Sequence, residues 1–331
     1  MSTEMTKAVE STTRDQAGSN LWFKYRAGRI TASRMKAVCH SDPTKPAQSL
    51  IKLICYPEAF RFVSKATSWG CKHEKSARDT YVSHMISKHD GFEVSDSGLV
   101  INPEWGHIGA SPDGVVKCSC CTIGVLEIKC PFCHRSDTIS EIVEQDKQFC
   151  LKKNADGTLS LDHSHTYFYQ VQTQIFVCGV EYGDFVICTF PENGEPVIHI
   201  ERILADHDCW TMCVRKCTEF YKACILPELM GRWYTRPCLP KSSNHSEASS
   251  TQAGPSHEST KECSSSSESN KKYCYCQGFE CDGDEMIACD YSKCPIEWFH
   301  TRCLKMKTIP SGKWYCPTCR KLPKCKRRNK K

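Results

Sequence analysis

The C-terminal segment carries a regular array of cysteine and histidine residues, which constrains its fold more than any other feature of the sequence. The intervals between successive members are one, twelve, four, five, two, twelve and two residues. The members are Cys274, Cys276, Cys289, Cys294, His300, Cys303, Cys316 and Cys319. Eight ligands supply two tetrahedral zinc sites in which the protein fills every position, as in structural zinc. A segment of roughly 50 residues has too little core to fold alone, so we expect zinc binding to stabilise it.

Composition indicates where the protein resides. The chain contains 26 cysteines, which in a reducing compartment indicate zinc ligands and small buried side chains rather than disulfides. The N-terminus has no apolar signal region, and no stretch approaches the roughly 20 apolar residues that cross a bilayer. We expect an intracellular protein with no membrane contact.

The C-terminal end of the chain is strongly basic. Residues 320–331 carry eight Lys and Arg side chains, so the net charge of +6 for the whole chain becomes −2 without them. This basic tail favours nuclear localisation or contact with a phosphate backbone, although it could also be merely solubilising.

Changes in composition divide the chain into five segments. Residues 237–272 are rich in serine and almost free of large apolar side chains, so they are predicted to form a disordered linker. We expect a polar N-terminal tail at 1–20, a mixed α/β domain at 21–236, a zinc finger at 273–320 and a basic tail at 321–331. In the α/β domain, hydrophobic periodicity predicts helices at 31–40, 46–56, 70–89, 165–179 and 206–225. It predicts strands at 97–101, 106–111, 123–129, 183–190 and 196–203.

Acidic side chains and a lysine mark one region of the α/β domain. In the segment VLEIKCP, strand alternation places Glu127 and Lys129 on one surface, with Leu126 and Ile128 directed into the core. Asp113 lies in SPDG, separated from Glu127 by thirteen residues, and a hairpin could bring the two acids together. Hard carboxylate oxygens suit Mg²⁺ or Mn²⁺, which would activate water and stabilise charge on a phosphate. The alternative is a solvated strand face, on which such residues are common.

Two predicted helices add polar residues to this region. Glu74 lies on the apolar stripe formed by Cys71, Ala77, Tyr81 and Met85, where an unpaired carboxylate would be costly. In HTYFYQVQTQIF, Gln170 and Gln174 lie one helical turn apart, opposite Phe168, Val171 and Ile175. These amides could hold water, metal-bound groups or DNA.

The finger closely resembles the PHD fingers of the inhibitor-of-growth proteins in its ligand spacing and in the segments GDEMIACDYSKCPIEWFH and GKWYCPTCR. The resemblance implies that Cys274, Cys276, His300 and Cys303 bind one zinc and Cys289, Cys294, Cys316 and Cys319 the other. It also implies a trimethyl-lysine cage of Tyr273, Met286 and Trp298, with Asp290 placed to hold a histone arginine. Aromatic faces and a polarisable sulfur suit a quaternary ammonium, which cannot donate hydrogen bonds. A RING-type ligase is disfavoured because Trp314 precedes Cys316 by two residues.

The upstream domain resembles the YqaJ viral recombinase family, which is similar to phage lambda exonuclease. The segments RAGRITAS, SPDG, LEIKCP and HTYFYQVQ occur in the family's order. The resemblance implies the restriction-endonuclease-like PD-(D/E)xK fold and metal-dependent DNA cleavage, often exonucleolytic. It implies that Glu74, Asp113 and Glu127 bind Mg²⁺ or Mn²⁺, that Lys129 is catalytic and that Gln170 is an accessory residue. It assigns Arg29 and Ser33, with Thr31 nearby, to the DNA 5′-phosphate, and either hydroxyl could cap the helix that follows.

A third zinc site is an open alternative. Cys118, Cys120 and Cys121 precede Glu127, while Cys130, Cys133 and His134 follow Lys129, but this spacing fits no standard site.

Together these features predict a chromatin-directed DNA nuclease that a finger tethers to methylated histone tails. The competing interpretation is a non-catalytic protein that binds chromatin and DNA with the same two folds. A homo-oligomer remains open, because the sequence does not report on assembly.

Overall fold

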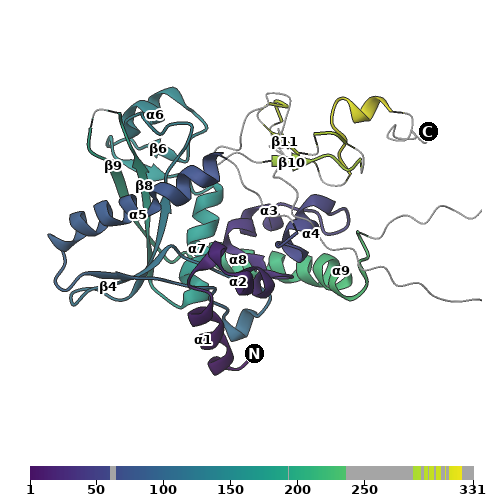
Figure 1. The fold of residues 1–331 in the computed structure, drawn as a ribbon, viewed down its shortest axis with the longest axis horizontal. Coiled ribbons are helices and arrows are strands. Elements are labelled where there is room, and N and C mark those ends of the chain that lie inside the picture. The colour runs from purple at the N-terminus through teal and green to yellow at the C-terminus, as the bar shows by residue number, and fades with distance from the viewer. Residues whose placement is uncertain are drawn as a thin grey trace, which may run out of the picture.

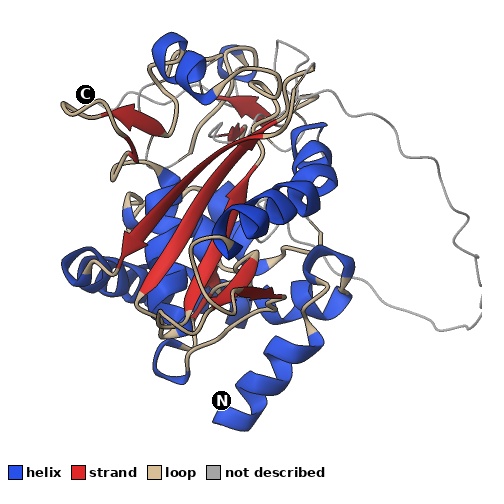
Figure 2. Cartoon of the chain, turned by 90° about the vertical axis from the view of Figure 1, so that its left-hand side faces the viewer, coloured by secondary structure: helices blue, strands red, loops and turns tan. Residues whose placement is uncertain are grey.

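The computed structural model describes residues 1–59, 65–192 and 194–235 and, farther on, 286–291, 294–296, 298–301, 303–306, 310 and 313–322 (Figure 1). A mixed five-stranded sheet with the order β2-β4-β5-β8-β9 forms the centre of the α/β domain. Its neighbouring strands are antiparallel except β5 and β8, which are parallel. Figure 2 shows these strands side by side. They are β2 (Glu93–Ser95), β4 (Gly114–Lys117), β5 (Gly124–Lys129), β8 (Tyr182–Thr189) and β9 (Val197–Leu204).

Two helices cover the two faces of the sheet (Figure 1). The helix α5 (Lys65–Ile86) buries Ala77 and Tyr81 against one face, and α7 (Thr166–Cys178) buries Val171 and Ile175 against the other. All eight residues of β8 are consequently buried, as is typical of a central strand in an α/β protein. A mixed sheet enclosed in this way confirms the α/β class that was predicted.

A helical lobe packs beside the sheet around a second core that includes Ile30, Met35, Ile51 and Phe220. Cys39, Cys213, Cys217 and Cys224 are buried in it, so these cysteines serve as small apolar side chains. The helices of the lobe are α2 (Asn20–Arg26), α3 (Met35–Cys39), α4 (Gln48–Cys55), α8 (His207–Phe220) with a π-helical turn at Tyr221–Ile225, and α9 (Leu226–Gly231). In the described part of the chain, no helix combines the length and apolar character needed to cross a membrane.

The N-terminal segment is helical, so the prediction of a polar tail at residues 1–20 was wrong. The helix α1 (Thr3–Thr12) buries Val9 against Leu99, and Gly98 donates its backbone N–H to Glu10 Oε1 at 3.0 Å. A Cβ atom at Gly98 would lie 1.9 Å from the carbonyl oxygen of Glu10, so the close approach requires glycine. Gln16, just beyond α1, donates its Nε2 to the carbonyl oxygens of Ser97 at 3.0 Å and Pro112 at 2.9 Å. Few apolar residues face the core, and for this reason hydrophobic periodicity gave no helical signal here.

Several other predicted helices and strands differ from those in the structure in type or in their first and last residues. The predicted strand at 97–101 is replaced by β2 and an isolated bridge between Val100 and Ala110. The predicted helix at 31–40 begins as strand β1 (Ile30–Thr31), which pairs in parallel with β3 (Ile108–Gly109), and continues as a 3₁₀ turn at Ala32–Arg34 and α3. Three elements between β5 and α7 were not predicted: α6 (Ile139–Gln145), β6 (Leu151–Lys153) and β7 (Leu159–Leu161).

The described part of the finger contains a small hairpin of β10 (Met286–Ala288) and β11 (Trp298–His300). Its core includes Ile287, Phe299 and Trp314, and the rings of the last two meet edge to face with centroids 5.5 Å apart. The predicted linker at 237–272 and residues 273, 274 and 276 lie outside the described residues, as does most of the basic tail.

Candidate functional site

The hairpin of β4 and β5 brings Asp113 to the strand that carries Glu127. Asp113 donates its backbone N–H to the carbonyl oxygen of Leu126 at 2.9 Å. Its Oδ2 atom accepts the backbone N–H of Ile128 at 2.7 Å. Asp113 is therefore held against β5 by both its main chain and its carboxylate, as the predicted hairpin requires.

Glu127 is the centre of a buried polar network, which we call the Glu127 network. Its side chain is 2% exposed. Its Oε1 atom lies 2.6 Å from Lys129 Nζ and accepts Gln170 Nε2 at 2.5 Å, while Oε2 accepts Gln174 Nε2. Lys129 Nζ lies 4.9 Å from the centre of the Tyr167 ring. Strand alternation correctly placed Glu127 and Lys129 on one face, but that face is covered by α7 and is not a solvated surface.

Gln174 was expected, with Gln170, to hold water, metal-bound groups or DNA, but it was not assigned a role at Glu127, which it holds as directly as Gln170 does. The signal was present in the one-turn spacing of the two glutamines. Both amides project from the same face of α7, so together they contact both oxygens of one carboxylate.

Glu74 contributes a third carboxylate from α5, where it is half-buried. Burial raises the pKa of Glu74, and the nearby charge of Glu127 adds to the effect. Burial likewise raises the pKa of Asp113 well above its ordinary value, reinforced by Glu127 and Glu74 and opposed by Lys129. The three acids thus interact, and a divalent cation would relieve their mutual repulsion. Cys71, which was predicted to lie on the same buried stripe, is exposed.

Arg78 joins these elements and was not predicted. It lies one turn after Glu74, forms an ion pair with Asp96 at 2.5 Å and donates Nη2 to the carbonyl oxygen of Asp113. Arg78 therefore links α5 to the start of β4. The four-residue interval from Glu74 was the available sequence signal.

The arginine beside Thr31 and Ser33 is Arg26 rather than Arg29. Arg29 directs its guanidinium to the carbonyl oxygens of Gly106 at 3.1 Å and Tyr25 at 2.5 Å. Arg26 Nη2 lies 3.4 Å from Thr31 Oγ1, which lies 3.3 Å from Ser33 Oγ. Burial, together with the like charge of Arg34, lowers the pKa of Arg26 to about 9. A guanidinium beside two hydroxyls, with the positive charge of Arg34 acting on it, suits an anion.

Neither hydroxyl caps the following helical turn, so that prediction was wrong. Thr31 occupies the N-cap position of the turn at Ala32–Arg34 without a side-chain capping bond, and Arg34 precedes α3. Since α3 has five residues, the anion site depends on side chains rather than on a helix terminus.

The described half of the finger brings one predicted zinc set together. The ligand atoms of Cys289, Cys294, Cys316 and Cys319 lie within 4.8 Å of one another. Of the other set, Cys303 Sγ lies 3.7 Å from His300 Nδ1, and Cys274 and Cys276 lie outside the described residues. These thiol and imidazole groups fit structural zinc.

The predicted methyl-lysine cage is described only in part. Met286 pairs with His300 and Ala288 with Trp298, so positions 286 and 298 lie on one face of the hairpin. Trp298 is half-buried, and Tyr273 lies outside the described residues. Asp290 Oδ2 accepts the backbone N–H of Trp314 at 2.6 Å, which fixes the carboxylate in place.

The three cysteines of the β4–β5 hairpin also gather, but with a partner that was not predicted. The ligand atoms of His89, Cys118, Cys120 and Cys121 lie within 4.8 Å of one another. His134, which was considered as a partner, instead contacts Asp137 at 3.1 Å and Asp146 at 3.2 Å.

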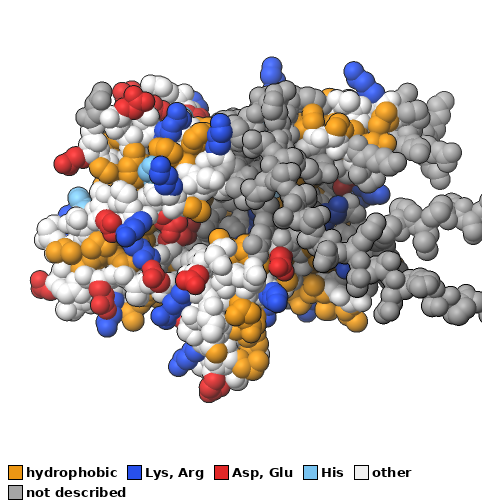
Figure 3. Space-filling model, in the orientation of Figure 1, with side chains coloured by type: hydrophobic (Ala, Val, Ile, Leu, Met, Phe, Trp, Pro, Cys, Tyr) orange, Lys and Arg blue, Asp and Glu red, His pale blue; other side chains and the backbone are white. Residues whose placement is uncertain are grey.

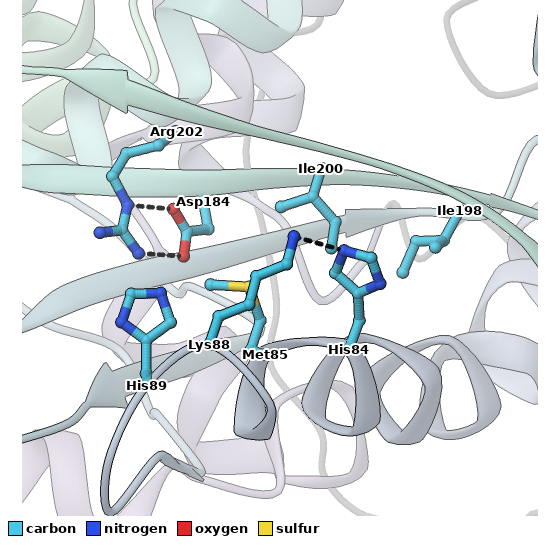
Figure 4. A pocket seen from close by; sticks show the side chains of 8 residues that line it. All are labelled: His84, Met85, Lys88, His89, Asp184, Ile198, Ile200 and Arg202. Atoms are coloured by element: carbon cyan, nitrogen blue, oxygen red, sulfur yellow. Dashed lines mark hydrogen bonds and ion pairs between the residues drawn. The ribbon is translucent and has the colours of Figure 1, made fainter.

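A cavity of about 310 Å³ lies between the end of α5 and strands β8 and β9. Figure 4 shows its lining, in which Arg202 pairs with Asp184 and Lys88 with His84. The cavity contains none of the three carboxylates or Lys129, so it is separate from the Glu127 network. Among the described residues seen in Figure 3, acidic and basic side chains are interspersed, so this part of the face offers no continuous basic surface for a nucleic-acid backbone.

Comparison with known proteins identifies two similarities. Residues 21–181 match the YqaJ-like viral recombinase domain. A separate segment of 48 residues is 52% identical to inhibitor of growth protein 1 of Mus musculus, covering 14% of this chain and 16% of that protein. A segment of 53 residues is 47% identical to chromatin modification-related protein png1 of Schizosaccharomyces pombe, covering 16% of this chain and 18% of that protein. The chain therefore spans less than a fifth of the length of these two relatives.

Solved structures of nucleases also resemble the chain. An alkaline exonuclease from Laribacter hongkongensis matches with a TM-score of 0.45 and 24% identity, covering 64% of this chain and 95% of that one. The shutoff and exonuclease protein of Kaposi's sarcoma-associated herpesvirus matches with a TM-score of 0.47 and 12% identity, covering 68% and 73%. The family match and the relatives confirm that a YqaJ-like domain is joined to a segment of the inhibitor-of-growth type.

Proposed function

We propose that this YqaJ-like domain is a metal-dependent DNA nuclease, and that the finger directs it to chromatin by reading methylated histone lysine. The observation that carries the nuclease proposal is the convergence of Asp113, Glu127, Lys129 and Gln170 at the β4–β5 hairpin. Within a domain that matches YqaJ, this set is better explained by cleavage chemistry than by packing alone.

The oxygen donors fit a hard divalent cation such as Mg²⁺ or Mn²⁺, which Glu74, Asp113 and Glu127 would hold. Such a cation supplies water activation and stabilises charge on the phosphate. Lys129, held 2.6 Å from Glu127, would orient the attacking water or neutralise charge that develops on the phosphate. Gln170 and Gln174 fix the orientation of the Glu127 carboxylate.

The 5′-phosphate of the DNA end would bind at Arg26, Thr31 and Ser33. This assignment replaces Arg29, whose guanidinium is directed to backbone carbonyls. The 3₁₀ turn that contains Ser33 packs against α7, the helix that carries Gln170. The anion site and the Glu127 network therefore meet on the same helix, which supports the binding of a DNA end next to the cleavage centre.

The finger would bind the histone tail through Tyr273, Met286 and Trp298, with Asp290 contacting a neighbouring arginine. Its similarity to inhibitor of growth protein 1 supports this role. A chromatin target and the basic tail together favour a nuclear protein.

The test is degradation of linear duplex DNA with or without a 5′-phosphate, in Mg²⁺, Mn²⁺ or EDTA. We expect cation-dependent degradation by the wild type and a loss of about 10²–10³-fold in Lys129→Ala, the scale of removing one preorganised stabilising group. Both proteins should still bind DNA. Lys117→Ala is the matched control, because Lys117 is an exposed lysine on the same hairpin.

A preference for 5′-phosphate that is lost in Arg26→Ala and kept in Arg29→Ala would support the end-binding assignment. Absence of degradation with every cation would favour the non-catalytic chromatin binder. Equal activity of Lys129→Ala and the wild type would contradict the assigned centre.

A further inference from the structure

The turn between β4 and β5 carries three cysteines whose sulfur atoms surround a histidine from another element. Cys120 Sγ lies 3.6 Å from Cys118 Sγ and 3.9 Å from Cys121 Sγ. His89 Nδ1 lies 3.2 Å from Cys120, 3.8 Å from Cys118 and 3.5 Å from Cys121. The sulfurs are too far apart for a disulfide, in which they are about 2.05 Å apart.

These separations match a tetrahedral zinc site. Bonds of about 2.3 Å to sulfur and 2.0 Å to nitrogen place two sulfurs about 3.8 Å apart and nitrogen about 3.5 Å from each sulfur. The two sulfur–sulfur distances, 3.6 and 3.9 Å, lie on either side of the expected sulfur separation. The three nitrogen–sulfur distances, 3.2, 3.5 and 3.8 Å, are centred on the expected nitrogen–sulfur separation. Thiolate and imidazole ligands in this ratio favour zinc over Mg²⁺ or Ca²⁺.

A second observation concerns charge. Three thiolates and one Zn²⁺ would leave a net charge of about −1, which a neighbouring cation would stabilise. Arg202 Nη1 lies 3.7 Å from Cys121 Sγ. Asp184 holds the same guanidinium through two contacts of 2.8 and 3.0 Å, as Figure 4 shows beside His89. Arg202 is thus a hydrogen-bond donor to Cys121 Sγ whose position is fixed by Asp184.

The position of the cluster suggests what it stabilises. His89 follows the end of α5, the helix that carries Glu74, whereas the cysteines close the hairpin between Asp113 and Glu127. One backbone hydrogen bond, from Ser119 N to Asp90 O at 2.8 Å, already joins these segments. A metal with four protein ligands would tie the helix to the hairpin much more strongly.

We propose that His89, Cys118, Cys120 and Cys121 bind a structural zinc ion that fastens α5 to the β4–β5 hairpin. All four positions are filled by the protein, so the metal has no open site for substrate. The site is separate from the finger and does not depend on the proposed nuclease activity. It includes His89 in place of the partners Cys130, Cys133 and His134.

The test is the zinc content of the purified full-length chain, measured by inductively coupled plasma mass spectrometry. Cys120→Ser and His89→Phe should each contain one equivalent less zinc than the wild type. His89→Cys should retain the full amount, because a fourth thiolate can replace the imidazole. His134→Asn is the matched control and should also retain it. Cys120 is exposed, so its substitution to serine should leave the fold intact.

Hydrogen exchange supplies a second, local measurement. Loss of the metal should speed exchange of the Ser119 amide in Cys120→Ser at least tenfold, with the centre of the sheet still protected. Equal zinc content in the wild type, Cys120→Ser and His89→Phe would overturn the proposal. Loss of zinc from His134→Asn with retention in His89→Phe would do the same.

Discussion

Glu127 in the sheet and His300 in the finger are both almost completely buried, with 2% and 1% exposure, but the chain supports them differently. The Glu127 carboxylate accepts hydrogen bonds from two side-chain amides and forms an ion pair with an ammonium group. His300 lies 3.7 Å from the sulfur of Cys303, at a position predicted to bind zinc. The α/β domain therefore orders its site through its own hydrogen bonds, whereas the finger has only a small core and is expected to need zinc to stay folded.

The largest expected effect comes from removing a finger ligand with Cys316→Ser. Zinc binding in small domains contributes about 10–16 kcal/mol, so the finger should unfold. The α/β domain has its own cores and should keep its unfolding temperature within a few degrees. Calorimetry of the full chain measures the unfolding temperature of the α/β domain, and amide NMR spectra show whether the finger is unfolded. Cys71→Ser, which changes an exposed cysteine, serves as control.

Unfolding of both regions together in Cys316→Ser would contradict the independence of the α/β domain from the finger. It would show that the finger and the α/β domain stabilise each other, and that residues 237–272 do not act as an independent linker.

A smaller effect is expected from Gln174→Leu. The substitution removes the donor to Glu127 Oε2 and leaves this buried oxygen without it. We expect the free energy of unfolding to fall by about 1–3 kcal/mol, the cost of an unsatisfied buried polar group. Urea denaturation measures this change. Gln145→Leu, on the exposed surface of α6, should have almost no effect. Equal stability of Gln174→Leu and the wild type would mean that the network does not hold Glu127.

The smallest effect concerns ligand binding. Trp298→Ala should weaken binding of a histone-tail peptide that carries trimethyl-lysine by about 0.5–2 kcal/mol, the range of one cation–π contact. Calorimetric titration of the full chain with methylated and unmethylated peptides would measure it. A wild-type protein that binds both peptides equally would refute the methyl-lysine cage, whatever the behaviour of the variant.

The sequence predicted the parts of the Glu127 network that depend on local geometry. Strand alternation put Glu127 and Lys129 on one face, and helical spacing put Gln170 and Gln174 on another. Both statements follow from the period of a single element. Burial of the Glu127 face was missed, because it depends on which helix covers the strand.

The period of a single element could not predict contacts between residues far apart in the sequence, or which of two nearby residues makes a contact. His89 lies 29 residues before Cys118, and no periodicity connects them. Arg26 and Arg29 lie on either side of Ala27 and Gly28, and only the course of the chain after α2 shows which guanidinium reaches Thr31. The order of the strands, with β5 next to β8, likewise depends on tertiary packing.

The two hydrogen bonds from Gln16 have a practical consequence for anyone who shortens this protein. The recognised domain begins at residue 21, which would be a natural place to cut. Such a cut would remove the amide that holds the carbonyl oxygens of Ser97 and Pro112, the second of which directly precedes Asp113. A protein trimmed in this way would keep every predicted catalytic residue but lose the two hydrogen bonds that hold the backbone next to Asp113.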